Sequence, residues 1–111
     1  MCRTYYNIAA LAEDVPSQAP VMMTEDSVAE DLLALLTEEG DFVGLIDDAG
    51  TALQVMYEPR REKLWVEIPV PSRSGSYGRH LSLAQTIDVF RHLPSRFSEK
   101  MIDGMEFQPW S

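Results

Sequence analysis

The chain has few of the residues that reactive or exported proteins use in numbers. It holds one cysteine, Cys2, and two histidines, His80 and His92, among 111 residues. A single thiol forms no internal disulfide, which favours a reducing compartment. No apolar run approaches the roughly 18 residues of a membrane span, and the first residues lack the apolar segment and cleavage region of a signal peptide. We therefore expect a cytoplasmic protein without a membrane-spanning part.

Catalytic and metal-binding patterns are equally scarce. A zinc site needs about four Cys, His or acidic ligands, and a nucleophilic cysteine needs a base or a positive neighbourhood. Cys2 lies far in sequence from His80 and His92. Residues 74–79 are rich in Gly and Ser but lack the lysine and the spacing of a phosphate-binding loop. The sequence predicts no catalytic residue, no cofactor and no metal site, and hence a protein that is not an enzyme.

The composition is that of one ordinary folded domain. Hydrophobic residues make up 45% of the chain, which is the usual share for a globular protein. A chain of this length can bury one modest core without disulfides or metal. We find no internal repeat, so we expect a single domain over residues 1–111.

Two segments have the apolar spacing and the capping residues of helices. Residues 24–39 begin with two possible caps, Thr24 and Ser27, and Gly40 is placed to end the helix. The second helix follows Ser82, which has Gln85 at capping-box spacing, and Pro94 stops it. Each segment has an apolar stripe: Val28, Leu32, Leu35 and Leu36 in the first, and Leu83, Ile87 and Phe90 in the second.

Several runs are β-prone: residues 2–8, 41–47, 51–57, 63–70 and 105–110, with a possible short strand at 20–23. Gly50 lies between two of them and can take the positive φ of a hairpin turn. Pro69 lacks an amide donor, which predicts that its strand frays or lies at an edge there. Residues 71–80 are interpreted as a Gly/Ser loop. The order of elements predicts an α+β fold, a single antiparallel sheet of about four to six strands with two main helices packed on it.

The net charge of −9 is distributed unevenly. The first 58 residues contain twelve Asp or Glu and one cation, Arg3, whereas the remainder contains six acids and eight Lys or Arg. An acidic surface repels phosphates, which disfavours direct nucleic-acid binding. It also accelerates encounter with a basic partner. Solubility alone is the simpler explanation of such acidity.

Trp65 can be interpreted in two ways. Leu64, Val66, Ile68 and Val70 alternate on one face of its strand, so Trp65 projects from the other face, with Gln54 and Met56. An exposed aromatic ring and a methionine beside carboxylates suit an interface. A second layer packed on that face would bury the same ring without any partner. The sequence leaves both interpretations open.

The motifs YY, PVMMTEDSVAEDLLALL, a strand hairpin, a strand with tryptophan, AQTIDVFRHL and FQPW follow one another along most of the chain. This order resembles a small α+β family of immunity proteins from bacterial polymorphic toxin systems, often encoded beside deaminase-type toxins. Members are often longer, and the stretch after Trp65, which bears on the toxin-facing loops, is compressed here. No contact residue is carried over, because the partners in such systems vary. The resemblance implies a protein that neutralises a cognate toxin in the cell that makes it. The residues that carry it are Tyr5, Tyr6, Pro20, Val21, Thr24, Leu32, Leu33, Leu36, Trp65, Phe90, Phe107 and Trp110.

Charge and resemblance together predict a non-catalytic acidic binding protein that occludes the basic active-site region of a cognate bacterial toxin. The alternatives are a phage-type inhibitor or nucleic-acid mimic that blocks a defence nuclease, and an acidic secretion chaperone. The expected partner is a basic protein, and the sequence leaves the oligomeric state open. The candidate partner-binding residues are Glu38, Glu39, Asp41, Asp47, Asp48, Met56, Glu58 and Trp65.

Overall fold

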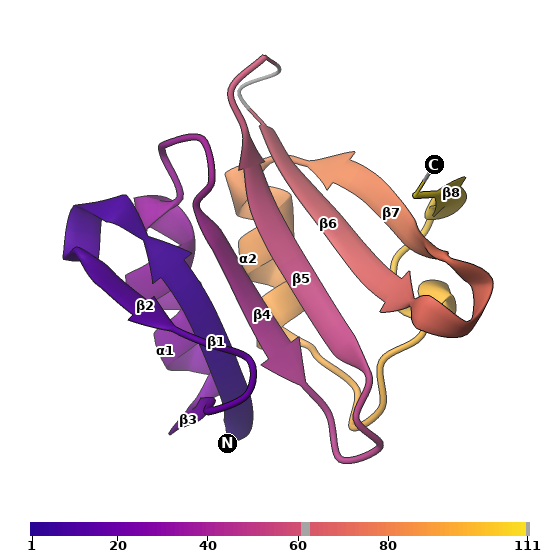
Figure 1. The fold of residues 1–111 in the computed structure, drawn as a ribbon, viewed down its shortest axis with the longest axis horizontal. Coiled ribbons are helices and arrows are strands. Elements are labelled where there is room, and N and C mark those ends of the chain that lie inside the picture. The colour runs from indigo at the N-terminus through magenta and orange to yellow at the C-terminus, as the bar shows by residue number, and fades with distance from the viewer. Residues whose placement is uncertain (61–62, 111) are drawn as a thin grey trace.

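The β-prone runs form one antiparallel sheet. The structure is a computed structural model that describes residues 1–60 and 63–110. Within that part of the chain the sheet has eight strands in the order β2-β1-β4-β5-β6-β7-β8, and β3 pairs with β1 beside β2 (Figure 1). The strands are β1 (Cys2–Ile8), β2 (Glu13–Val15), β3 (Val21–Met23), β4 (Phe42–Ile46), β5 (Ala52–Glu58), β6 (Lys63–Val70), β7 (Gly75–Leu81) and β8 (Glu106–Pro109).

The expected α+β class is confirmed, but the expected four to six strands are too few. Strand β7 lies in the segment that we predicted to be a Gly/Ser loop, and β2 lies in a segment for which we predicted no strand. Gly75 and Gly78 of β7 are strand positions at which aromatic rings leave no room for a side chain. A Cβ at Gly75 would collide with the Phe107 ring, and one at Gly78 with the Trp65 ring. Glycine here makes room for a neighbour, a requirement that composition alone does not distinguish from loop flexibility.

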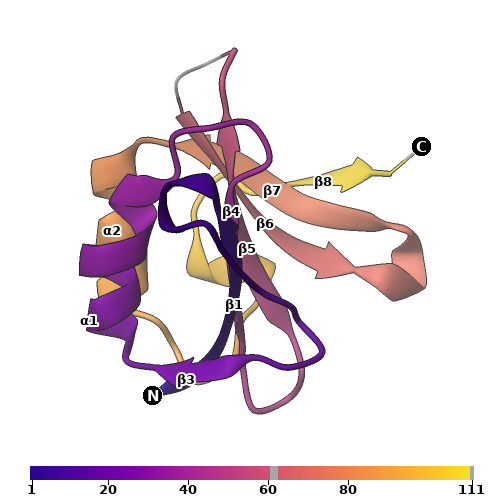
Figure 2. The ribbon, with the colours of Figure 1, turned by 60° about the vertical axis from the view of Figure 1, so that its left-hand side comes forward.

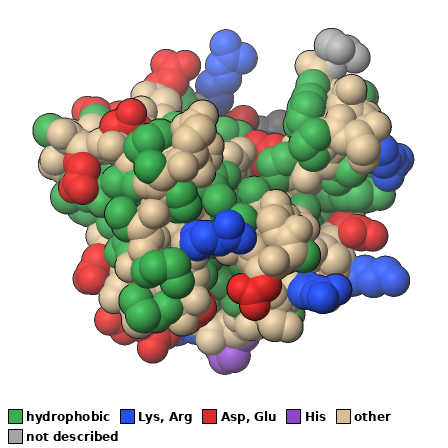
Figure 3. All heavy atoms as spheres, turned by 60° about the horizontal axis from the view of Figure 1, so that its bottom comes forward, with side chains coloured by type: hydrophobic (Ala, Val, Ile, Leu, Met, Phe, Trp, Pro, Cys, Tyr) green, Lys and Arg blue, Asp and Glu red, His purple; other side chains and the backbone are tan. Residues whose placement is uncertain are grey.

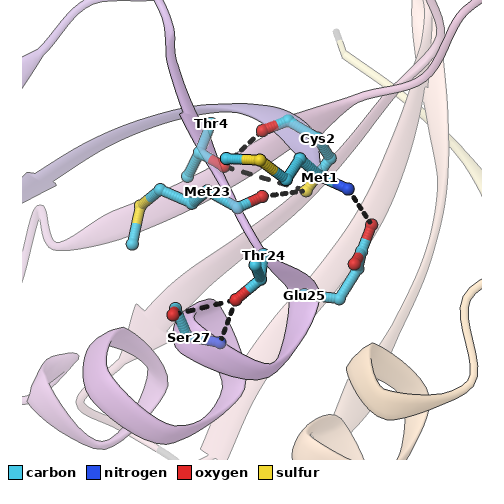
Figure 4. A network of polar contacts seen from close by, with 7 residues as sticks. All are labelled: Met1, Cys2, Thr4, Met23, Thr24, Glu25 and Ser27. Carbon is cyan, nitrogen blue, oxygen red and sulfur yellow. Dashed lines mark hydrogen bonds and ion pairs between the residues drawn. The ribbon is translucent and has the colours of Figure 1, made fainter.

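The first helical segment is shorter and less regular than predicted. It consists of α1 (Glu25–Ser27), a π-helical stretch (Val28–Leu32) and a 3-10 turn (Leu33–Leu35). Thr24 is the cap, since its Oγ1 accepts a hydrogen bond from the Ser27 amide at 3.1 Å (Figure 4). Helical structure stops before Glu38 because the carboxylate of Asp41 accepts the amides of Thr37 and Glu38 and holds the chain in a reversal.

The second helix, α2 (Leu83–Arg91), has the predicted start. Ser82 Oγ accepts the Gln85 amide at 3.1 Å, and Gln85 Oε1 accepts the Ser82 amide at 3.0 Å, which completes the capping box. Phe90 on this helix is fully buried. The remaining helical pieces are short 3-10 turns at Ala9–Leu11, Pro71–Arg73 and Glu99–Met101.

The helices cover only one face of the sheet. Figure 2 shows α1 and α2 together on one side, with β7 and β8 extending away from them. The core lies between these helices and the aliphatic side chains that alternate along the central strands: Val43, Leu45, Leu53, Val55, Leu64, Val66 and Ile68. None of the helices in the described residues is long and apolar enough to span a membrane. The alternate side chains of the same strands project from the face without helices, which we call the open face.

Candidate functional site

Strand register assembles the open face from residues far apart in the sequence. Antiparallel pairing places one row of residues directly opposite one another across six strands: Tyr5, Gly44, Gln54, Glu67, Gly78 and Glu106. The next row is Asn7, Phe42, Met56, Trp65 and His80. Because side chains alternate along a strand, both rows point away from the buried aliphatic residues. The open face therefore combines aromatic, acidic and amide groups.

Tyr5 lies across Gly44, where no side chain could fit beneath its ring. Its hydroxyl donates to Gln54 Oε1 at 2.6 Å, and the side chain is buried. Burial, together with the nearby negative charge of Glu67, raises the pKa of Tyr5 to about 12. On this half of the open face, the Tyr5 ring and its hydroxyl are therefore buried and already engaged within the protein.

Trp65 repeats the arrangement on the other half of the face but stays partly exposed. Its ring lies across Gly78, and its centroid is 4.8 Å from that of the His80 ring. His80 Nε2 is 2.7 Å from Glu58 Oε2, so the ring is tied to the end of β5. No helix of the described residues covers Trp65, so the ring is not buried by a second layer. The indole is held in place and still reaches solvent.

A hollow of about 640 Å³ opens beside Trp65, between β6 and β8. Figure 3 shows acidic, basic and hydrophobic side chains interspersed over one face of the molecule. One cation at its rim, Arg79, is anchored elsewhere, since its Nη1 donates to the Asp103 carbonyl at 2.6 Å. The residues that line this space, here called the Trp65 hollow, are Glu58, Trp65, Gly78, Arg79, His80, Gly104, Glu106 and Gln108.

Two of the predicted partner-binding acids are occupied inside the fold. Asp41 is buried, and its carboxylate accepts three backbone amides, those of Ala9, Thr37 and Glu38, at 3.0 to 3.1 Å. Asp41 thereby joins the end of the first helical segment to the end of β1. The uneven charge distribution led us to place Asp41 at a partner surface. Its hydrogen bonds instead connect two segments inside the fold.

Asp47 has the same kind of role at the other end of β4. It is buried, with Oδ1 accepting the amides of Ala49 and Thr51 and Oδ2 accepting the amide of Phe97 at 2.8 Å. The carboxylate closes the β4–β5 turn and fastens the segment after α2 to it. Asp41 and Asp47 therefore leave the set of residues that a partner could reach.

The remaining candidates fall into two groups. Asp48 is exposed at the β4–β5 turn, whereas Glu58 ends β5, about 20 Å away by strand rise. Glu58 and Glu39 line a common hollow of about 340 Å³. Met56 is the register neighbour of Trp65. The structure thus gathers Glu39, Met56, Glu58 and Trp65 around the end of β5, with the exposed Glu38 next to Glu39 in the chain, and leaves Asp48 apart.

Two residues of the open face escaped the sequence analysis, His80 and Glu106. His80 was placed in a loop, and only recognition of β7 as a strand shows that it faces Trp65. The two-residue alternation of GSYGRHL, with its glycines treated as strand positions, was the available signal. Glu106 becomes a neighbour of Trp65 only through the pairing of β8 with β7.

Among the described residues, no group of three or more His, Cys, Asp or Glu side chains is arranged to hold a metal ion. Burial raises the pKa of the Cys2 thiol, which disfavours the thiolate form that nucleophilic attack requires. Comparison with known proteins identifies no relative: no family model matches the chain, and no curated protein or solved structure matches it.

Proposed function

We propose that this protein is a non-catalytic binding protein that docks a basic protein on its open face and neutralises it, the partner being a bacterial toxin. The observation that carries the proposal is Trp65, packed across Gly78 but partly exposed on a sheet face without helices, between the carboxylates of Glu58 and Glu106. The net charge of −9 points to a cationic partner.

The physical argument has two parts. Binding free energy concentrates in a few aromatic or flexible apolar side chains that lose water on association, and Trp65 with Met56 can supply them. Carboxylates around these anchors, from Glu38, Glu39, Glu58 and Glu106, would steer the partner and set the association rate. A toxin that acts on nucleic acid needs a basic substrate cleft, and an acidic face that occupies this cleft would block substrate entry.

The partner to test is the protein encoded directly beside this one. We expect it to be basic, to bind tightly, and to lose its toxicity when the two proteins are co-expressed. A phage-type inhibitor would instead bind a defence nuclease through the same face, and a secretion chaperone would bind its neighbour without abolishing an activity. Binding without loss of activity would contradict neutralisation.

A charge-reversal set tests the surface. Glu38, Glu39 and Glu106 are exposed, so changing all three to Lys should leave the fold intact and slow association at low salt by about tenfold or more. The matched control changes three exposed acids of the helical segments to Lys, namely Asp26, Asp31 and Asp88. Both variants alter the net charge equally. Equal association rates for the two variants would show that the carboxylates around Trp65 and Met56 do not steer the partner.

A further inference from the structure

We propose that the Trp65 hollow is a pocket for one arginine side chain of the protein partner. This inference rests on the proposed function for the identity of the partner, and it adds which chemical group enters which site. The hollow has a volume of about 640 Å³ and lies beside the Trp65 indole ring, which packs across Gly78 and against the His80 ring.

The acidic groups of the hollow have unused acceptors. Glu106 is exposed and makes no side-chain hydrogen bond among the described residues. Glu58 uses Oε2 for His80, and no described donor reaches its Oε1. Register places Glu106 opposite Gly78, the residue on which the Trp65 ring lies. Two carboxylates therefore flank the ring from β5 and from β8, with acceptor atoms free for a ligand.

Among the described residues, no Lys or Arg side chain lies within ion-pair distance of Glu58 or Glu106. Arg79 belongs by register to the other face and gives its Nη1 to the Asp103 carbonyl at 2.6 Å. Lys63 lies opposite Glu58 at the start of β6 and is exposed, with no carboxylate of the described residues within ion-pair distance. Glu67, in the same row as Gly78 and Glu106, adds a further negative charge. The lining of the hollow thus contains two carboxylates, Glu58 and Glu106, and one guanidinium, Arg79, so it carries a net negative charge and suits a cation.

An arginine side chain fits this combination better than other groups. Its planar guanidinium can stack on an indole and donate hydrogen bonds within its own plane to carboxylates at the same time. A lysine can approach the ring but offers a single compact charge without a plane. Phosphate and other anions meet repulsion from Glu58 and Glu106. An apolar side chain could contact the ring but would strip water from both acids without giving them a donor.

The test uses the full chain labelled for amide NMR and three short peptides, Gly-X-Gly, with X as arginine, lysine or citrulline. Citrulline has the shape of arginine without its charge. The arginine peptide should shift the amide signals of Trp65, Gly78, His80 and Glu106, the citrulline peptide should not, and the lysine peptide should bind several-fold more weakly. Equal binding of citrulline, equal binding of lysine, or shifts confined to other surfaces would overturn the assignment.

Two variants locate the binding energy. Glu106→Gln removes a charge at an exposed position and should weaken the arginine peptide by about three- to tenfold. Trp65→Phe keeps an aromatic ring over Gly78 and should weaken it by about two- to fivefold. The control Asp31→Asn removes an exposed charge on the helical segment and should leave the affinity unchanged. An unchanged affinity in Glu106→Gln, with the variant's urea midpoint equal to that of the wild type, would contradict the pocket.

Failure of this inference and failure of the proposed function are distinguishable. If the arginine peptide binds the hollow but the neighbouring toxin stays active, the arginine pocket is supported and the proposed neutralisation is contradicted. Suppose instead that wild type, Glu106→Gln and Trp65→Phe neutralise the toxin equally and the arginine peptide shifts no open-face signal. The proposed neutralisation is then supported and the arginine pocket is contradicted.

Discussion

The face of the sheet under the helices carries aliphatic side chains, whereas the open face carries aromatic rings laid over glycines, with polar groups beside them. Val43, Leu45, Leu53 and Val55 on the covered face are fully buried. On the open face, Tyr5 crosses Gly44 and Trp65 crosses Gly78, each ring filling the space that a glycine leaves. The two faces of the same strands therefore differ: one excludes water and stabilises the fold, and the other carries aromatic and polar side chains without a covering layer of helices.

The largest effect is expected on the covered face. Phe90 is fully buried between α2 and the sheet, so Phe90→Ala should lower the free energy of unfolding by about 3–5 kcal/mol through lost burial and a cavity. Urea denaturation measures this. Met56→Ala, at a half-buried position on the open face, should cost clearly less. An equal loss of unfolding free energy for the two changes would contradict the claim that the covered face contributes more to stability than the open face.

Asp47 and Asp48 are adjacent in sequence but differ in burial, so their contributions to stability can be compared directly. Asp47→Asn replaces one carboxylate oxygen by an NH₂ group, which cannot accept the amides that this oxygen now binds. We expect a loss of about 1–3 kcal/mol in the free energy of unfolding. Asp48→Asn, at the exposed neighbour, should change it by less than about 0.5 kcal/mol. Equal effects in urea denaturation would show that Asp47 does not brace the turn.

The ring-over-glycine arrangement can be tested through coupling. Gly78→Ala places a methyl group where the Trp65 ring lies, and should cost about 1–3 kcal/mol of unfolding free energy because the ring must move. In a Trp65→Ala background the methyl group has room, so the same change should cost much less. Additive costs for the two substitutions would mean that the ring does not pack on Gly78 in solution.

A smaller effect should appear in alkaline solution. The pKa of Tyr5 is raised to about 12 in the folded protein, against about 10 for an unfolded tyrosine. Folding therefore favours the protonated phenol: its contribution to stability is complete below about pH 10 and is lost as the pH rises toward 12. Tyr5→Phe should reduce the decline in unfolding free energy over this range, measured by urea denaturation at several pH values. An identical decline would contradict the closed environment of Tyr5.

Patterns within one element predicted their local structure well. The bounds of β1 and β6, the hairpin with Gly50 at φ 85°, and the capping box of Ser82 and Gln85 are as expected. Pro69 lies beyond the last pairing of β6 with β5, at Glu67, and among the described strands it pairs with β7 alone. Each of these features depends on residues close together in the sequence.

Features that depend on distant residues were missed. Asp41 and Asp47 count as two negative charges in the sequence, but their amide partners include Ala9 and Phe97, which only the tertiary fold brings near. Likewise, the glycines of β7 resemble a flexible loop until the rings that require them are known. The Trp65 hollow combines Glu58, His80 and Glu106 from three strands, and no local pattern connects them.

The most direct test of the open face as the docking surface is an amide NMR map of the labelled full chain with the basic protein encoded beside it. The largest changes should fall on Met56, Trp65, His80 and Glu106, with the signals of α2 unchanged. Changes concentrated on α2 or at Asp48, with the open face unaffected, would contradict the proposal.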